Sequence, residues 1–464
     1  MYYENMWLWS ICIGASLLDS SLAWPVSNFG SSLRRQTSST STGSDILTVL
    51  KNVADNPSVS GNNTSETAAN ILSGLQGNSN GNNTQSIKVA LDAIAEIFSS
   101  GIEDIAQASD ELIAKGLIPS DIFDLLNGYA DFSLNSISNV NTRSPSSTIY
   151  PSKSSDDAPY SLDENTLRGA IYIPPSFSYG ANGKKPIILV PGTAVPAGTT
   201  YYFSFSKINE AANVDPVWVN IPSASLGDAQ VNSEYVAYAI NYISDVSSSN
   251  VTVLSWSQGG LDTQWALKYW PSTRDAVEDF IAISPDFHGT IIQALVCPGF
   301  PSYPCTPSIW QQGWDANFIK TLRDDDGDSA YVPTTTLYST YDEIVQPMSG
   351  PSASAFLSDA RDVGVTNNHL QTICANQPAG GYYTHEGVLY NPLAWALAVD
   401  AINNDGPGDP SRLNLSEICS RSIPPQLQLD DVLGTEGLLL VALVEILGYG
   451  NRATSEPPTV SYAQ

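Results

Sequence analysis

The sequence predicts an α/β protein with a mostly parallel sheet, preceded by a small all-α module. Beyond residue 155, short runs rich in Val and Ile alternate with longer stretches of helical periodicity, which indicates parallel strands joined by crossover helices. Between residue 45 and about residue 127 the pattern is helical throughout, with Asn-, Gly- and Ser-rich turns. The chain has 464 residues, of which 42% are hydrophobic, enough for one large domain and a smaller one.

The first 23 residues have the pattern of a signal peptide. An apolar stretch at 7–18 is followed by Ser21-Leu22-Ala23, a small-residue cleavage site. The segment departs from the usual pattern because it contains Glu4 and no Lys or Arg, so a buried N-terminal helix is the alternative. We expect a secreted, extracellular protein.

Charge and cysteine content agree with export. The net charge of −28 argues against nucleic acid and anionic membrane surfaces as partners. No other apolar run is long enough to span a bilayer, since Glu445 interrupts the run that starts at Gly437. Without Cys12 of the signal, four cysteines remain, which suits two disulfides in an oxidising compartment. Sequons occur at Asn62, Asn63, Asn82, Asn250 and Asn414.

Four further segments follow the signal. Residues 24–44 form a polar segment with Arg34-Arg35, a possible pro-region, and residues 45–130 form the helical module. Residues 131–155 form a Ser- and Asn-rich linker, and residues 156–464 form the catalytic domain. The module contains no His or Cys, so three roles stay open: a removable pro-region, a lid-like cover or an inert spacer. We expect it to be dispensable for chemistry, so that a chain starting near Ser155 keeps its activity.

In the catalytic domain, β-rich runs and helical stretches follow one another. The expected strands cover 169–173, 186–191, 217–221, 251–255, 280–284 and 334–338. The expected helices cover 231–246, 259–269 and 391–402.

The run Ser-Trp-Ser-Gln-Gly-Gly at 255–260 lies between an expected strand and an expected helix. A serine in a tight strand-to-helix turn with small neighbours is a nucleophile elbow, the signature of an α/β-hydrolase fold. The leading small residue is Ser255 rather than Gly, so the consensus is only partly met. Because the strand, the turn and the helix follow one another as an elbow requires, we take Ser257 as the candidate nucleophile.

A hydroxyl nucleophile needs a base and an orienting carboxylate. Of the three histidines, His385 alone lies in a loop after a suitable acid, Asp342, which itself follows an expected strand. His288 precedes that acid, and His369 lies in a probable strand, where it is better explained as structural. The sequence thus predicts a Ser257, Asp342 and His385 triad that needs neither metal nor cofactor.

The oxyanion of the reaction needs hydrogen-bond donors. The elbow offers the Gln258 N–H, and the loop after the strand at 186–190 offers Thr193 with its N–H and hydroxyl.

Five segments carry a resemblance to a known family: 189–193 (LVPGT), 256–260 (WSQGG), 285–290 (PDFHGT), 308–312 (SIWQQ) and 337–347 (LYSTYDEIVQP). Over about residues 157–422 the chain resembles the Candida antarctica lipase B family of fungal α/β hydrolases. The resemblance implies the same triad and oxyanion hole. It also implies polar substrate-binding residues at Asp286 and Gln312, with Trp256 beside the serine.

The resemblance further implies a Cys374–Cys419 bridge, which would leave Cys297 and Cys305 as the second pair. The chain departs from the family pattern in three places. Residues 194–198 read Ala-Val-Pro-Ala-Gly, His288 stands where a lysine is familiar, and the helical module has no counterpart in the smaller family member.

The expected function is a secreted serine carboxylic-ester hydrolase, with triacylglycerol lipase favoured. A cutinase-like or polyester esterase and an acyltransferase use the same triad and are alternatives. A non-catalytic secreted binding protein is the alternative from another class. The expected partners are an ester or lipid substrate and a transient lipid–water interface, and the expected state is a monomer.

Overall fold

The computed structural model describes residues 46–56, 62–78, 86–118, 133–297, 300–302 and 304–464, which all belong to the unit Thr42–Gln464. The predicted signal peptide, the polar segment at 24–44 and the helical stretch expected at 122–126 lie outside these residues.

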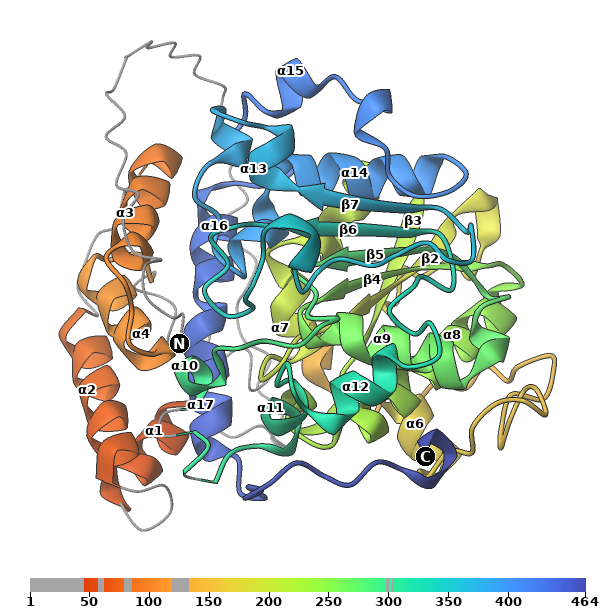
Figure 1. Ribbon diagram of the computed structural model, residues 1–464, viewed down its shortest axis with the longest axis horizontal. Coiled ribbons are helices and arrows are strands. Elements are labelled where there is room, and N and C mark those ends of the chain that lie inside the picture. Colours follow the sequence, from red (N-terminus) through yellow and green to blue (C-terminus); the bar gives the residue numbers. More distant parts are fainter. Residues whose placement is uncertain (1–45, 57–61, 79–85, 119–132, 298–299, 303) are drawn as a thin grey trace, which may run out of the picture. The chain divides into compact units, whose positions relative to one another are not determined.

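Within the described residues a seven-stranded sheet has the order β1-β3-β2-β4-β5-β6-β7 (Figure 1). Its strands are β1 (Ile171–Tyr172), β2 (Lys185–Val190), β3 (Val214–Val219), β4 (Val251–Trp256), β5 (Val277–Ile283), β6 (Thr334–Tyr338) and β7 (Val365–His369). The β1–β3 pair is antiparallel and the other pairs are parallel. The expected mostly parallel α/β fold is confirmed.

Helices cover both faces of the sheet because successive residues of a strand point to opposite sides. Ile187 and Leu189 of β2 belong to one apolar cluster, and Ile188 and Val190 to the other. Helix α14 (Pro392–Asn403) packs on the first face, and α8 (Ala229–Ser247) and α9 (Gln258–Tyr269) pack on the second (Figure 1).

The shorter helices of the catalytic domain lie in its connections. They are α6 (Glu164–Gly169), α7 (Ala197–Tyr202), α10 (Gln293–Val296), α11 (Pro307–Gln311), α12 (Asn317–Arg323), α13 (Leu370–Ile373), α15 (Leu415–Ile418), α16 (Leu429–Glu436) and α17 (Leu438–Gly448).

Some predicted boundaries were wrong, for local reasons. Strand β3 begins at Val214, three residues earlier than expected, and includes Pro216, although proline lacks the N–H that a strand ladder uses. Strand β1 is shorter than expected because only Ile171 and Tyr172 pair with β3. Helix α8 begins two residues earlier than expected, since Asp228 caps it by accepting a hydrogen bond from the N–H of Gln230.

The helical module forms α1 (Ile46–Asp55), α2 (Asn62–Asn78), α3 (Ile87–Ser99) and α4 (Ile105–Ala114). Helices α1 and α4 pack against α17, and the apolar core that contains Leu50 and Leu112 also contains Leu440 and Leu443. Helix α17 is apolar on nearly every side, as is typical of a helix buried on all faces.

Residues of the expected linker lie on the catalytic domain. The Leu134 carbonyl oxygen accepts hydrogen bonds from Trp218 Nε1 and Asn220 Nδ2, and the Asp245 carboxylate accepts from Ser146 and Ser147. A chain that begins near Ser155 would lose these contacts together with the module, so its activity stays a prediction to test.

Disulfides join Cys297 to Cys305 and Cys374 to Cys419, as expected. Among the helices of the described residues, none combines the length and the apolar character needed to cross a bilayer.

Candidate active site

Ser257 lies between β4 and α9 in a strained turn. Its φ of +55° and ψ of −131° are rarely adopted by a residue other than glycine. The close packing of strand and helix requires Gly259, because a Cβ there would lie 2.6 Å from the carbonyl oxygens of both Val190 and Pro191. This is the elbow that the sequence predicts.

His385 and Asp342 form a hydrogen-bonded pair. His385 Nδ1 lies 2.7 Å from Asp342 Oδ2, and the other carboxylate oxygen accepts hydrogen bonds from the N–H groups of Ile344 and Val345. His385 Nε2 is buried and has no hydrogen-bond partner in the described part of the chain. The imidazole therefore has one nitrogen fixed by a carboxylate and the other free.

The backbone of His385 is held on both sides. Its N–H donates to Glu343 Oε2 at 2.8 Å, and its carbonyl oxygen accepts from Trp256 Nε1 at 3.1 Å and from Ser284 Oγ. The Trp256 and His385 rings lie 5.0 Å apart between centroids. The residue that precedes the serine thus positions the histidine loop.

The electrostatics favour an imidazole that takes up a proton readily. Burial lowers the pKa of His385, but the Asp342 carboxylate, with Glu343 and Asp286, outweighs burial, so that the pKa is raised overall. A histidine with this environment suits a general base.

Thr193, Gln258 and Gln312 form a polar group beside the serine. Thr193 Oγ1 lies 2.7 Å from Gln258 Oε1 and 2.9 Å from Gln312 Oε1. The amide of Gln312 is oriented because its Nε2 donates to Gln258 Oε1 and to the Ser308 carbonyl oxygen. The Gln258 N–H has no intrahelical partner, since Gln258 is the first residue of α9.

The loop after Thr193, where the chain departs from the family pattern, turns at Ala194. This residue has a φ of +63°, and its N–H donates to the Ala224 carbonyl oxygen at 2.7 Å.

A cavity brings most of the predicted residues together. Its polar end contains Ser257, His385, Thr193 and Gln312, and Trp256 also lines it. Asp286 is fully buried but is not among the lining residues, and burial raises its pKa to about 7. Both carboxyl oxygens of Asp286 lack a hydrogen-bond partner among the described residues.

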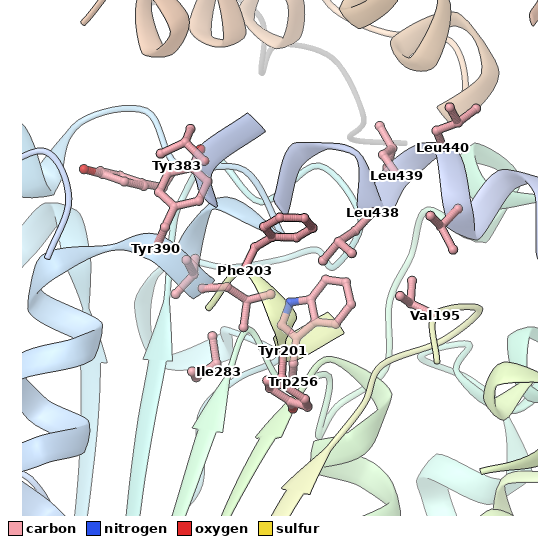
Figure 2. Packing of buried hydrophobic residues seen from close by; sticks show 14 of the residues in the cluster. Val195, Tyr201, Phe203, Trp256, Ile283, Tyr383, Tyr390, Leu438, Leu439 and Leu440 are labelled. Carbon is pink, nitrogen blue, oxygen red and sulfur yellow. The ribbon is translucent and has the colours of Figure 1, made fainter. Parts of the chain in front are cut away.

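Most of the remaining wall of the cavity is apolar, with Thr290, Gln293 and Glu386 as its polar residues, and we did not predict it. It includes Ile105 of α4, Ile309 of α11 and, from α17, Leu438, Leu439, Ala442 and Ile446. Figure 2 shows Leu438, Leu439 and Leu440 on the helix next to the cluster that contains Trp256. The available signal was the continuous apolar run at 438–444, whose burial the sequence implies but whose neighbours it does not.

The other two histidines lie elsewhere. Burial lowers the pKa of His288 to about 4, and the ring of His369 stacks on Tyr338 between the hydroxyls of Thr340 and Thr372. Both belong to other parts of the structure, as the sequence predicts.

Together, the sheet and the serine elbow define the chain as an α/β hydrolase. No protein-family model matches the sequence. The chain is 31% identical over 286 residues to lipase B of Pseudozyma antarctica, and the match covers 60% of this chain and 79% of that protein. The crystal structure of Aspergillus fumigatus lipase B superposes with a TM-score of 0.87 at 61% identity, covering 90% of this chain and 100% of that chain.

The chain therefore belongs to the lipase B family, as its motifs predict, and it is a lipase or carboxylesterase.

Proposed function

We propose that the chain is a secreted triacylglycerol lipase that acts through Ser257, His385 and Asp342 and a covalent acyl-enzyme. One observation carries the proposal. Ser257 and His385 line the same largely apolar cavity, and His385 has Nδ1 bonded to Asp342 and Nε2 free.

In the first step Ser257 Oγ attacks the ester carbonyl carbon while His385 Nε2 takes the hydroxyl proton. Asp342 keeps the imidazole in the tautomer with a proton on Nδ1 and stabilises the imidazolium. The bond to the alcohol then breaks, the alcohol oxygen receives the proton from Nε2, and the acyl group stays on Ser257.

The negative charge on the carbonyl oxygen needs donors, and Thr193 and Gln258 supply them. The Gln258 N–H at the start of α9 is unpaired within the helix, and a helix N-terminus favours negative charge. The Thr193 hydroxyl has one hydrogen and lies within hydrogen-bonding distance of two amide oxygens. To donate this hydrogen to the oxyanion, the hydroxyl rotates away from the two amide oxygens.

The apolar wall supports a lipid acyl chain as the substrate group that enters the cavity. Hydrophobic residues of α4, α11 and α17 form this wall, and burial of an acyl chain against them is favourable by about 0.8 kcal/mol for each methylene. Water, activated by His385, then attacks the acyl-enzyme and releases the fatty acid.

Export is part of the proposal. Disulfides at Cys297–Cys305 and Cys374–Cys419 suit an oxidising compartment, and the sequon residues Asn250 and Asn414 are exposed and available for glycosylation.

The test is reaction of the full chain with a serine-directed alkyl phosphonate, followed by peptide mapping and assays on short- and long-chain triacylglycerols. We expect one adduct per chain, on Ser257, and loss of ester hydrolysis in proportion to labelling. Hydrolysis that persists in fully labelled protein, or labelling of another serine, would contradict the proposal.

A further inference from the structure

Three glutamates lie close to the catalytic histidine and come from three separate elements, and one of them, Glu386, also lines the cavity. Glu343 follows Asp342 in the loop after β6, Glu386 follows His385, and Glu436 is the last residue of α16. Glu386 and Glu436 are 1% and 0% exposed. Each of the three has one buried carboxyl oxygen without a hydrogen-bond partner among the described residues. The triad chemistry uses none of these oxygens.

The three carboxyl groups form a continuous connection. Glu343 Oε2 accepts from the His385 N–H, and Glu436 Oε1 accepts from the Tyr390 hydroxyl at 2.6 Å and the Thr384 hydroxyl at 3.3 Å. Glu386 lies between them, within hydrogen-bonding reach of both other carboxyls. The connection therefore runs from the acid loop, through the histidine loop, to α16.

Such a connection requires protons. A carboxylate is only an acceptor, so each contact between two carboxyl groups holds only while one of them carries a proton. The titratable groups that face the cluster are Asp342, His385 and Tyr382 near Glu343, and Tyr390 near Glu386 and Glu436. None of the four carries a permanent positive charge that could replace the protons.

The surroundings favour the protonated forms. Burial, with the adjacent Asp342 carboxylate, raises the pKa of Glu343 to about 7, and burial raises the pKa of Glu436 to about 7. Burial also raises the pKa of Glu386 well above its ordinary value. Two ionised neighbours in this site would repel each other without solvent to screen them.

Helix α16 makes different contacts in its first turn, at its middle and at its last residue. Its middle packs on Phe203, since a Cβ at Gly434 would lie 2.6 Å from that ring, and its first turn is paired through Asp431 with Lys207. Its last residue is Glu436, and α17 begins two residues later with Leu438, which lines the cavity. Glu436 thus lies two residues before the part of the apolar wall that α17 forms. Figure 2 shows Phe203, Tyr390 and Leu438 in this region.

We propose that Glu343, Glu386 and Glu436 form a proton-dependent latch that ties the catalytic-histidine loop to α16 and so holds α17 against the cavity. The latch is closed while the carboxyl groups share protons and opens when they ionise. Its effect on turnover rests on the proposed function, whereas the latch itself does not.

The sign of the pH dependence follows from the raised pKa values. Groups whose pKa is higher in the folded state than in the unfolded state stabilise the fold below the unfolded value, about 4.5. This stabilisation decreases as the pH rises toward 7 and is lost above it. The latch therefore loosens between about pH 5 and pH 7.

The test is amide hydrogen exchange of the full chain from pH 5 to pH 8, with protection corrected for the intrinsic exchange rate. In the wild type we expect protection of residues 429–448 to fall by up to about tenfold per pH unit up to pH 7 and then to level off. In Glu436→Gln we expect protection of the same residues to fall by less than about threefold per pH unit, because the amide donates a hydrogen bond without a titrating proton. Glu386→Gln is a second variant with the same expectation, should the first not fold.

Glu445→Gln is the matched control. Glu445 lies on α17 outside the cluster, and burial raises its pKa to about 6. Glu445 has a raised pKa of its own, so its replacement removes part of the fall below about pH 6. We expect this variant to keep the wild-type fall between pH 6 and pH 7. A wild-type fall over that interval in both latch variants, or flattening over it in Glu445→Gln instead, would overturn the latch. Hydrolysis of a soluble short-chain ester, measured in parallel, tests the proposed function separately, because absent turnover in the wild type would contradict that function alone.

Discussion

The two sides of the cavity are built in different ways. The polar side comes from tight loops at the ends of parallel strands, where Ser257, Asp342 and His385 follow β4, β6 and β7 in the chain. The apolar side comes from helices distant in sequence, α4 and α17, which pack against each other.

We infer that the polar side of the cavity determines the chemistry and that the apolar side determines the selectivity. Each residue on the polar side is fixed by specific hydrogen bonds, such as those of Asp342 with His385 and of Trp256 with the His385 carbonyl oxygen. The apolar side consists of interchangeable aliphatic side chains that contribute shape. We therefore expect changes on the polar side to affect every ester alike, and changes on the apolar side to affect long-chain esters.

The largest expected effect tests the polar side. Ser257→Ala should lower kcat by on the order of 10⁶-fold for all chain lengths, because the nucleophile acts as a unit with its base. Ser255→Ala is the control from the same motif, since its buried hydroxyl has no hydrogen-bond partner in the described part of the chain, and it should keep its activity. Equal losses in both variants would contradict the assignment.

Removing each disulfide tests how much it stabilises the side of the cavity next to it. Cys374–Cys419 spans 45 residues and encloses His385, and Cys297–Cys305 spans 8 residues next to the wall residues Val296 and Ile309. On the chain-entropy model, paired Cys→Ser replacement should lower the unfolding free energy by roughly 3–4 kcal/mol for the first and about 2.5 kcal/mol for the second. Denaturant unfolding measures both, and a larger loss from the shorter loop would contradict the model.

Thr193→Val sharpens the assignment of the oxyanion donors. The change keeps the shape and the backbone N–H but removes the hydroxyl, so kcat should fall on the order of 10²–10³-fold with little change in KM. Thr252→Val, at a buried hydroxyl of β4 without a partner among the described residues, is the matched control. A fall of less than about threefold in Thr193→Val would assign the role to another group.

The smallest expected effect tests the apolar side. Ala442→Leu fills space next to Leu439 in the cavity wall, so the ratio of kcat/KM for long-chain over short-chain esters should fall about tenfold. Short-chain turnover of the same variant is the internal control. An equal loss for both chain lengths would show that the wall acts on the chemistry rather than on the acyl chain.

The polar side could be predicted from the sequence because its geometry depends on neighbours along the chain. Ser257 between a strand and Gly259 specifies a turn, and the elimination of His288 and His369 leaves His385. The apolar side could not, because the packing of Ile105 near Leu439 depends on tertiary contacts that no local pattern encodes. The run at 438–444 indicated a buried helix but not what covers it. The connection of Glu386 with Glu436 was equally hidden, since 50 residues separate the two glutamates.

The most direct test of the account is a crystal structure of the full chain inactivated with a long-chain alkyl phosphonate. We predict phosphorus bonded to Ser257 Oγ, its oxygen facing the Gln258 N–H and the Thr193 hydroxyl, and the alkyl chain along Leu439, Ala442 and Ile446. An alkyl chain that leaves the cavity without touching α17, or phosphorus on a different residue, would contradict it.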